Sequence, residues 1–186
     1  MRIGITAVQG AFAEHEQVLE KLNIDYVELR KAEDLNTPID GLILPGGEST
    51  VQGKLLKELD MFGALQKQIR DGLPVLATCA GLILLAEKLS NDDHTYFGTL
   101  PVTVRRNAYG RQLGSFHTYG DFGSEKDVPM TFIRAPFIEG TREDVDILAR
   151  VDGNIVGAAW ENQIGISFHP ELDSDLRIHR MFLERI

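Results

Sequence analysis

The stretch from Pro74 to Ala86 constrains the fold of this chain more than any other. It opens with a short apolar run, Pro74–Thr78, which is bounded by Gly72 and Pro74 and is typical of a buried strand. Cys79 comes next, and an apolar stretch with helical character follows it and ends near Glu87–Lys88. A strand, a tight turn with a nucleophile-type residue at its tip and then a helix form the pattern of a nucleophile elbow.

An elbow of this kind turns so sharply that the neighbours of its tip must be small, and the tip residue is strained. The surroundings of Cys79 meet this condition with Ala77, Ala80 and Gly81, although Ala77 stands where the common pattern has glycine. The predicted turn would hold the sulfur above the sheet and direct the helix N-terminus at it. That position favours the thiolate.

A lone cysteine in an apolar context is usually a small buried hydrophobe. A catalytic role for Cys79 is therefore supported only when a second segment of the chain is considered. Gln163–Phe168 is another apolar run typical of a strand, and His169, Pro170 and Glu171 follow it. Pro170 favours extended backbone before it, so His169 and Glu171, two residues apart, are expected to project to the same side. A carboxylate beside an imidazole orients a general base and stabilises its cation. All three side chains would then lie at strand ends, where open α/β sheets bind ligands.

The first half of the chain alternates strands and helices. Strands are expected at Arg2–Val8, Asp25–Leu29 and Asp40–Leu44, and helices at Ala11–Leu22, Ser49–Leu59 and Phe62–Arg70. This alternation predicts a parallel sheet covered on both faces, a three-layer α/β fold. Shorter runs from Tyr96 to Trp160 indicate mixed or antiparallel pairing, and Ser174–Ile186 is expected to be a closing helix. With 186 residues and no linker or repeat, we expect one domain, residues 1–186.

The segment Pro45–Thr50, with the sequence Pro-Gly-Gly-Glu-Ser-Thr, follows a predicted strand and opens a predicted helix. One interpretation is a turn in which glycine adopts unusual φ angles and Ser49 caps the helix. A phosphate-binding loop is disfavoured because its lysine is missing. Beside a cysteine nucleophile, the segment would instead supply backbone N–H donors where negative charge develops during acyl transfer. We therefore assign an oxyanion hole to the N–H groups of Gly47 and Ala80.

Charge and composition exclude several classes of function. The chain has 28 acidic and 19 basic residues, a net charge of −9 and no basic cluster, which opposes nucleic-acid binding. No apolar run approaches the roughly 20 residues of a membrane span, and the N-terminus does not resemble a signal peptide. The single cysteine rules out an intramolecular disulfide and fits a reducing compartment, so we expect a cytoplasmic protein with no membrane contact.

Three further histidines give only weak signals. His15 lies between two glutamates, His94 follows two aspartates, and His179 lies between an isoleucine and an arginine. None forms a pair at metal-ligand spacing, so no metal site is expected.

Three motifs together resemble the triad-type (class I) glutamine amidotransferases: Thr78–Leu82 around Cys79, the triplet His169–Glu171 and the segment Pro45–Thr50. A narrower resemblance, to the glutaminase subunits of pyridoxal 5′-phosphate (vitamin B6) synthases, rests on Gly41–Thr50, Arg106–Gln112, Phe132–Pro136 and Ser167–Leu172. It extends from about Ile3 to the C-terminus. Two segments depart from the family pattern, Thr6–Val8 and Ser115–Gly123, the second of which contains His117.

The resemblance implies a flavodoxin-like, doubly wound, mostly parallel core and the hydrolysis of L-glutamine to L-glutamate and ammonia without a cofactor. Cys79 would be the nucleophile, and His169, oriented by Glu171, would move the proton. Besides Gly47, the family pattern places these residues at the substrate: Glu48, Ser49, Arg106, Ile133 and Arg134. Arg106 and Glu48 suit the carboxylate and ammonium of free glutamine. The implied partner is a barrel-shaped synthase subunit, which would consume the ammonia and dock near Gln9–Ala11.

Three alternatives remain open at this point. The chain could serve a different synthase, such as the imidazole glycerol phosphate synthase of histidine biosynthesis. It could be a regulatory module that binds a partner without chemistry, which the intact cysteine, histidine and acid disfavour. A cysteine protease of similar fold is disfavoured by the charged residues expected in the pocket.

Overall fold

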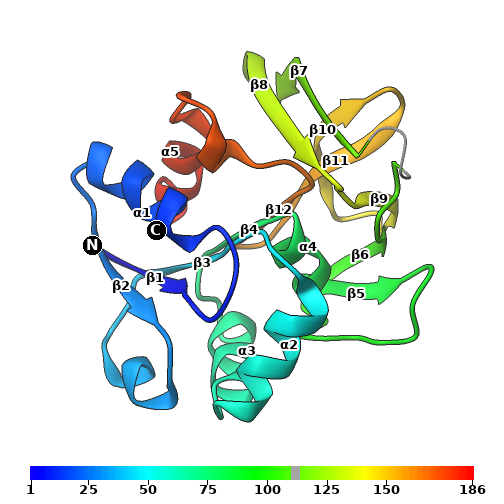
Figure 1. Cartoon of the computed structure of the whole chain (residues 1–186). Coiled ribbons are helices and arrows are strands. Elements are labelled where there is room, and N and C mark those ends of the chain that lie inside the picture. The colour runs from blue at the N-terminus through cyan, green and yellow to red at the C-terminus, as the bar shows by residue number, and fades with distance from the viewer. Residues whose placement is uncertain (110–113) are drawn as a thin grey trace.

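The computed structural model describes residues 1–109 and 114–186 (Figure 1). Over the first half, strands and helices alternate: β1 (Arg2–Thr6), α1 (Phe12–Lys21), β2 (Asp25–Leu29), the 3₁₀ turn η1 (Ala32–Asn36), β3 (Gly41–Leu44), α2 (Ser49–Glu58), α3 (Phe62–Arg70), β4 (Val75–Thr78) and α4 (Ala80–Leu85). Strands dominate the second half: β5 (Ala86–Leu89), β6 (Leu100–Arg105), β7 (Ser115–Phe122), β8 (Glu125–Ile133), β9 (Phe137–Thr141), β10 (Asp146–Val151), β11 (Asn154–Trp160) and β12 (Gln163–Ile166), followed by the 3₁₀ turn η2 (Pro170–Leu172) and α5 (Arg177–Leu183).

The main sheet of the described residues has the strand order β2-β1-β3-β4-β12-β11-β9-β6-β5, with β10 paired to β11. Its first five strands are parallel, in the order typical of flavodoxin-like sheets. The strands β11, β9 and β6 then pair antiparallel, and β7 and β8 form a separate two-stranded ribbon. The structure therefore confirms the predicted doubly wound core and the predicted mixed pairing between Tyr96 and Trp160.

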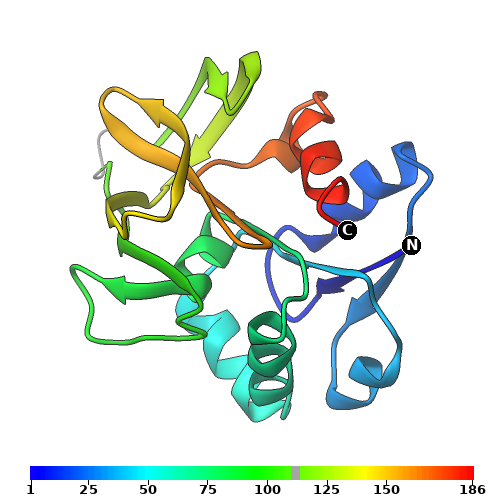
Figure 2. The ribbon, with the colours of Figure 1, turned by 180° about the vertical axis from the view of Figure 1, so that it is seen from behind.

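The core lies on both faces of the sheet, because side chains of its strands alternate between two hydrophobic clusters. On β3, Leu42 and Leu44 pack into the cluster under α2 and α3, whereas Ile43 packs into the cluster under α1 and α5. Figures 1 and 2 show α1 and α5 side by side on one face and α2 and α3 on the other. Strands buried on both faces explain the continuous apolar runs of the sequence.

Several predicted boundaries are wrong, among them the ends of β1, at Thr6 rather than Val8, and of α5, at Leu183 rather than Ile186. The helix after Cys79 ends at Leu85 rather than near Lys88, because Ala86 leaves the helical region (φ −54°, ψ 133°) and begins β5, which pairs in parallel with β6. The closing helix begins at Arg177 rather than Ser174, where the carboxylate of Asp175 accepts a hydrogen bond from the Arg177 N–H (2.9 Å). Strand pairing sets the end of α4 and a side-chain hydrogen bond sets the start of α5. The periodicity of apolar residues predicts neither of these contacts.

The sheet brings the carboxyl ends of three neighbouring strands together. In the parallel register, Leu44 of β3 is beside Ala77 of β4, and Thr78 of β4 is beside Ile166 of β12. The loops that leave these strands carry Gly46, Cys79 and His169, so segments more than a hundred residues apart meet at one edge. Within 1–109 and 114–186, no helix combines the length and apolar character needed to cross a membrane.

The close approach of α4 to β3 gives a test of this architecture. A Cβ on Gly81 would lie 2.1 Å from the carbonyl oxygen of Leu44, which is backbone and cannot move aside. We expect Gly81→Ala to lower the free energy of unfolding by about 1–3 kcal/mol. Gly63→Ala is the matched control, because Gly63 is exposed on α3 with open space around it, and alanine there should add about 0.5–1 kcal/mol. Chemical denaturation measures both, and equal effects would contradict the packing described here.

Candidate active site

The backbone at Cys79 forms the sharp turn that the sequence predicts. Cys79 has φ 49° and ψ −101°, a strained conformation for a residue with a Cβ. Its N–H donates to the carbonyl of Ile166 on β12 (2.8 Å), which fixes the turn to the neighbouring strand. The small residue Gly81 lets α4 leave directly over β3. The sulfur therefore sits at the end of β4, at the N-terminus of α4.

His169 and Glu171 are in direct contact: Nδ1 of the imidazole lies 2.7 Å from Oε1 of the carboxylate. The predicted pairing is confirmed, but the predicted reason is wrong for Glu171, which lies in the 3₁₀ turn η2 and not in extended backbone. The His169 N–H donates to the carbonyl of Thr131 on β8 (2.8 Å) and holds the start of this turn. With Nδ1–H donating to Glu171, Nε2 of His169 is free for the thiol.

The environment favours the charged form of His169. Burial by itself lowers the pKa of this imidazole, but its interactions with Cys79 and Glu171 outweigh burial and raise the pKa from 6.5 to about 10. Burial also raises the pKa of the Glu171 carboxyl, and the nearby His169 opposes that rise. Each group thus favours the charged form of the other, as the orienting acid and base of a triad do.

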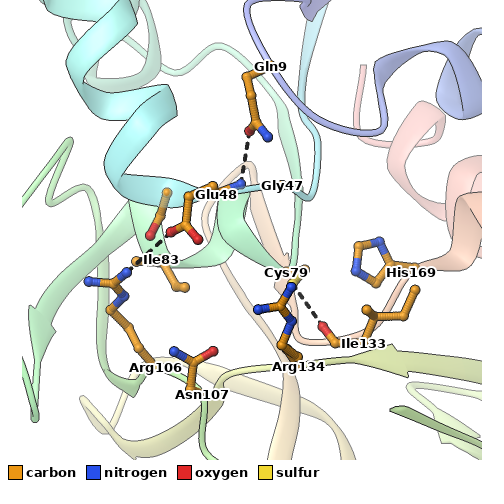
Figure 3. Close-up of a pocket in the computed structure, with 11 residues that line it drawn as sticks. Gln9, Gly47, Glu48, Cys79, Ile83, Arg106, Asn107, Ile133, Arg134 and His169 are labelled. Carbon is orange, nitrogen blue, oxygen red and sulfur yellow. Dashed lines mark hydrogen bonds and ion pairs between the residues drawn. The ribbon is translucent and has the colours of Figure 1, made fainter. Parts of the chain in front are cut away.

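The thiol and imidazole enclose one end of a cavity of about 300 Å³ (Figure 3). The Sγ–H of Cys79 is directed at the carbonyl oxygen of Ile133, 3.9 Å away, so the sulfur rests between β8 and the His169 ring. In Figure 3, His169 lies on one side of Cys79 and the pair Glu48–Arg106 on the other. A ligand in this cavity would reach from the thiol to those charges.

Opposite charges line the far end of the cavity. Nη2 of Arg106 lies 3.4 Å from Oε1 of Glu48, and its Nη1 lies 2.5 Å from a carboxylate oxygen of Asp92. The backbone of Arg106 is also held, since its N–H and C=O both bond to the side-chain amide of Asn91 at 3.0 Å. Arg106 is therefore a fixed cation, which suits the carboxylate of an amino acid.

The loop after β3 is held by two other segments, the end of β4 and the segment between β1 and α1. The Gly46 N–H donates to Oγ1 of Thr78 (3.0 Å), and the Gly46 carbonyl accepts from the N–H of Ala11 (3.0 Å). The Glu48 N–H donates to Oε1 of Gln9 (2.9 Å). A Cβ on Gly46 would lie 2.3 Å from the His169 ring, so glycine is needed where this loop passes the imidazole.

Of the residues singled out from the sequence, those that line the cavity are Gly47, Glu48, Ser49, Cys79, Arg106, Ile133, Arg134 and His169. Glu171 is buried behind His169, and Ala80 is the first residue of α4. The interpretation of Ser49 as a helix cap is wrong, because Glu48 occupies the N-cap position and Ser49 begins the helix. Of the Arg106–Gln112 motif, residues 110–112 lie outside the described residues.

Several lining or supporting residues were missed. Gln9, Ile83 and Asn107 also line the cavity, and Asp92 holds Arg106. Ile83 had a usable signal, because it lies one helical turn after Cys79 and so on the same side of α4. His15 and His179 had none: both are fully buried behind the site, although His15 lies between two glutamates and His179 precedes an arginine.

The chain matches the SNO glutamine amidotransferase family over residues 5–186. It is 64% identical over 186 residues to a pyridoxal 5′-phosphate synthase subunit PdxT of Desulfitobacterium hafniense (strain DSM 10664 / DCB-2), covering 100% of this chain and 94% of that protein. The protein of the same description from Streptococcus pneumoniae (strain CGSP14) is 50% identical, with 99% and 96% covered. A crystal structure of a glutamine amidotransferase superimposes with a TM-score of 0.93 at 39% identity, covering 98% of this chain and 97% of that one.

The strained backbone at Cys79 predicts that glycine at this position gives a more stable protein than alanine. Glycine adopts φ 49°, ψ −101° without a Cβ penalty, so we expect Cys79→Gly to be more stable than Cys79→Ala by about 1 kcal/mol. At Ala77, a buried strand position without positive φ, the same loss of a Cβ in Ala77→Gly should instead destabilise by about 0.5–1 kcal/mol. Thermal and urea unfolding of the three variants checks this. A Cys79→Gly variant less stable than Cys79→Ala would mean that the turn is not strained.

Proposed function

The chain belongs to the SNO glutamine amidotransferase family, and from that membership we propose that it is the glutamine-hydrolysing subunit of a pyridoxal 5′-phosphate synthase. The observation that carries the chemistry is the Cys79 elbow beside the His169–Glu171 pair, at one end of a cavity whose other end holds Arg106 and Glu48. We further propose that residues 1–186 act as one glutaminase domain, which two hydrophobic clusters on a shared sheet support. The free thiol at its centre needs a reducing compartment, and we place the reaction in the cytoplasm.

In the proposed reaction, the Cys79 thiolate attacks the side-chain amide carbon of L-glutamine. His169, carrying the proton from the thiol, gives it to the amide nitrogen as the carbon–nitrogen bond breaks, and ammonia leaves. His169 then takes a proton from water, which attacks the thioester and releases L-glutamate and the thiol. Glu171 keeps the imidazole in the required tautomer throughout, through its 2.7 Å contact with Nδ1.

Backbone donors would stabilise the negative charge on the amide oxygen. We assign this role to the N–H groups of Gly47 and Ala80. The N–H of Ala80 is in the first turn of α4, where backbone donors have no acceptor within the helix. Gly47, with φ 156°, is exposed on the loop that passes His169. The two proposed donors thus come from separate segments, the loop after β3 and the first turn of α4.

The charges at the far end would recognise the amino-acid part of glutamine. Arg106 suits the α-carboxylate and Glu48 the α-ammonium, while Ser49 lies beside Glu48 at the start of α2. Ile133, the last residue of β8, and Arg134, which follows it, would contact the substrate through backbone. Arg134 has φ 42°, so this strand end turns sharply at the cavity. When glutamine binds, its carboxylate would pair with Arg106 and its ammonium with Glu48, in place of the direct Arg106–Glu48 contact.

Ammonia must then reach an acceptor. We propose that a barrel-shaped synthase subunit receives it in a hetero-oligomeric complex and uses it to form pyridoxal 5′-phosphate. The full-length similarity to synthase subunits favours this partner over the synthase of histidine biosynthesis.

Removal of the thiol is the direct test. Cys79→Ala should release no glutamate above background in the presence of the synthase subunit, because no covalent intermediate can form, while partner binding should persist. Coupled glutamate detection measures the first property and sedimentation the second. Residual glutamate release at the wild-type rate would show that Cys79 is not the nucleophile.

A second prediction concerns regulation: the subunit alone should be nearly silent and should become active on docking to its synthase. The proposed switch is the Gly46–Gly47 peptide, whose two glycines let it rotate at low steric cost. In this structure the Gly46 carbonyl is bound by the N–H of Ala11, next to the Gln9–Gly10 segment that we propose as the docking surface. A partner that displaces Ala11 would therefore free this peptide.

Loss of one oxyanion donor costs about 10²–10³ in rate in comparable acyl transfer, which is enough for such a gate. The measurement is steady-state glutamate production at saturating glutamine, titrated with purified synthase subunit. Equal kcat with and without the partner would contradict the gate and leave the assignment of the triad unaffected.

A further inference from the structure

Behind the proposed triad lies a pair of buried imidazoles that the reaction does not use. His15 on α1 and His179 on α5 have no exposed surface, and Nδ1 of His15 lies 2.9 Å from Nε2 of His179. Figures 1 and 2 show α1 and α5 side by side, which is how residues 164 positions apart meet. Two histidines buried against each other next to a carboxylate need a physical explanation, since burial of polar groups is costly unless they are bonded.

The other ring nitrogen of His15 faces the triad. His15 Nε2 lies 3.5 Å from Oε2 of Glu171, the oxygen that does not contact His169. In the described part of the chain this oxygen has no hydrogen bond of good geometry. His15 Nε2 is also 3.3 Å from Oγ1 of Thr78, which accepts the N–H of Gly46. Nε2 of His15 thus lies next to both Glu171, the proposed acid of the triad, and Thr78, which holds the loop after β3.

One arrangement of protons avoids a buried N–H without an acceptor at His179. If His15 carries its proton on Nε2, it donates toward Glu171 and Thr78, its Nδ1 accepts from the Nε2–H of His179, and Nδ1 of His179 keeps a lone pair. The opposite tautomers would turn the lone pair of His15 Nε2 toward the carboxylate and bury an N–H at Nδ1 of His179. That nitrogen has no hydrogen-bond partner among the described residues, and a buried N–H without an acceptor is the costlier choice.

We propose that His15 and His179 are positioning residues for the glutaminase reaction: His179 fixes the tautomer of His15, and the Nε2–H of His15 holds the outer oxygen of Glu171. This proposal rests on the assignment of Glu171 as the orienting acid. Held at both oxygens, the carboxylate has one orientation and keeps Oε1 directed at Nδ1 of His169.

Both imidazoles are suited to donate as neutral groups. Burial lowers the pKa of His15 well below 6.5, and the neighbouring His179 and His169 lower it further. Burial lowers the pKa of His179 to about 4. A cation at His15 would pair with Glu171 and compete with the imidazolium of His169. A neutral donor supports the carboxylate and leaves its charge for His169.

The pair His15–His179, called the dyad below, should therefore influence the pH dependence of the reaction. Burial raises the pKa of Glu171, and loss of a donor to its charged form raises that pKa further. The acid limb of kcat should then move to higher pH, because the carboxylate becomes protonated earlier as pH falls. The groups that face this carboxyl and the turn that holds it are His169 with Cys79 behind it, His15 and Glu14 from α1, His179 from α5, and Asp173 with His117 beyond the turn.

The first experiment compares two replacements of His15 in the complex with the synthase subunit. His15→Phe keeps a ring and removes the donor, whereas His15→Gln keeps an N–H close to the position of Nε2. We expect His15→Phe to lower kcat about 10–100-fold, as loss of a residue that orients a functional group through a hydrogen bond commonly does. KM for glutamine should stay nearly unchanged. Its acid limb should move up by about one pH unit, and His15→Gln should restore most of both properties.

A double-mutant cycle separates positioning from packing. In a Glu171→Gln background the carboxylate is gone, so His15→Phe should lower kcat by no more than about twofold further. Val18→Ala is the matched control: Val18 is buried on the same helix, and its truncation should lower the melting temperature without moving kcat or the acid limb. If His15→Phe does not fold, His179→Leu and His179→Gln test the second link, with the same loss and rescue expected.

The outcomes distinguish the proposal from its premise. If Glu171→Gln leaves kcat at the wild-type value, Glu171 is not the orienting acid and the proposed mechanism fails. If Glu171→Gln is slow but His15→Phe lowers kcat equally in both backgrounds, or leaves the acid limb in place, the mechanism stands and the positioning role of the dyad is refuted.

Discussion

The strained turn at Cys79 is the constraint on which the rest of this structure depends. A residue with a Cβ stays at φ 49° only if its surroundings hold it there, and they do so from both sides: β12 accepts its N–H, and α4 packs directly over β3 at Gly81. The central strands must therefore be rigid and buried on both faces. The two hydrophobic clusters supply that rigidity, and the turn in return places the sulfur where three strand ends meet.

Buried charge is the second theme of the site. His169 and Glu171 are both withdrawn from water; burial lowers the pKa of the imidazole and raises that of the carboxyl, and each group opposes this effect on the other. The imidazole pair behind Glu171 extends this dependence into the core between α1 and α5. At the open end, Arg106 is held between Asp92 and Glu48, so the cation that would meet a substrate is fixed before binding. Preorganised charges at both ends lower the cost of orienting a small zwitterion.

The loop after β3 connects these two ends and links them to the surface. Glycine at position 46 lets the loop pass the His169 ring, and a Cβ at Gly10 would lie 2.0 Å from the carbonyl oxygen of Gly46. The segment after β1 and the loop after β3 thus touch through backbone at Gly10 and Gly46. A displacement of one is felt directly by the other, which is the physical basis of the gate proposed above.

The sequence by itself determined the alternating elements and the elbow, because strand burial and small residues around Cys79 are local properties. It also predicted the pairing of His169 with Glu171, but from extended backbone, whereas the 3₁₀ turn η2 produces that contact. It also identified most of the cavity through motifs that recur in a family. Only the tertiary structure decided where α4 stops, that Asp92 fixes Arg106, and that His15 and His179 lie behind Glu171. Those facts depend on helices and loops that meet across the sheet. A histidine between two glutamates gives no local sign that its ring is buried, since successive residues of a helix face different directions, and here Glu14 and Glu16 stay partly exposed while the imidazole faces the core.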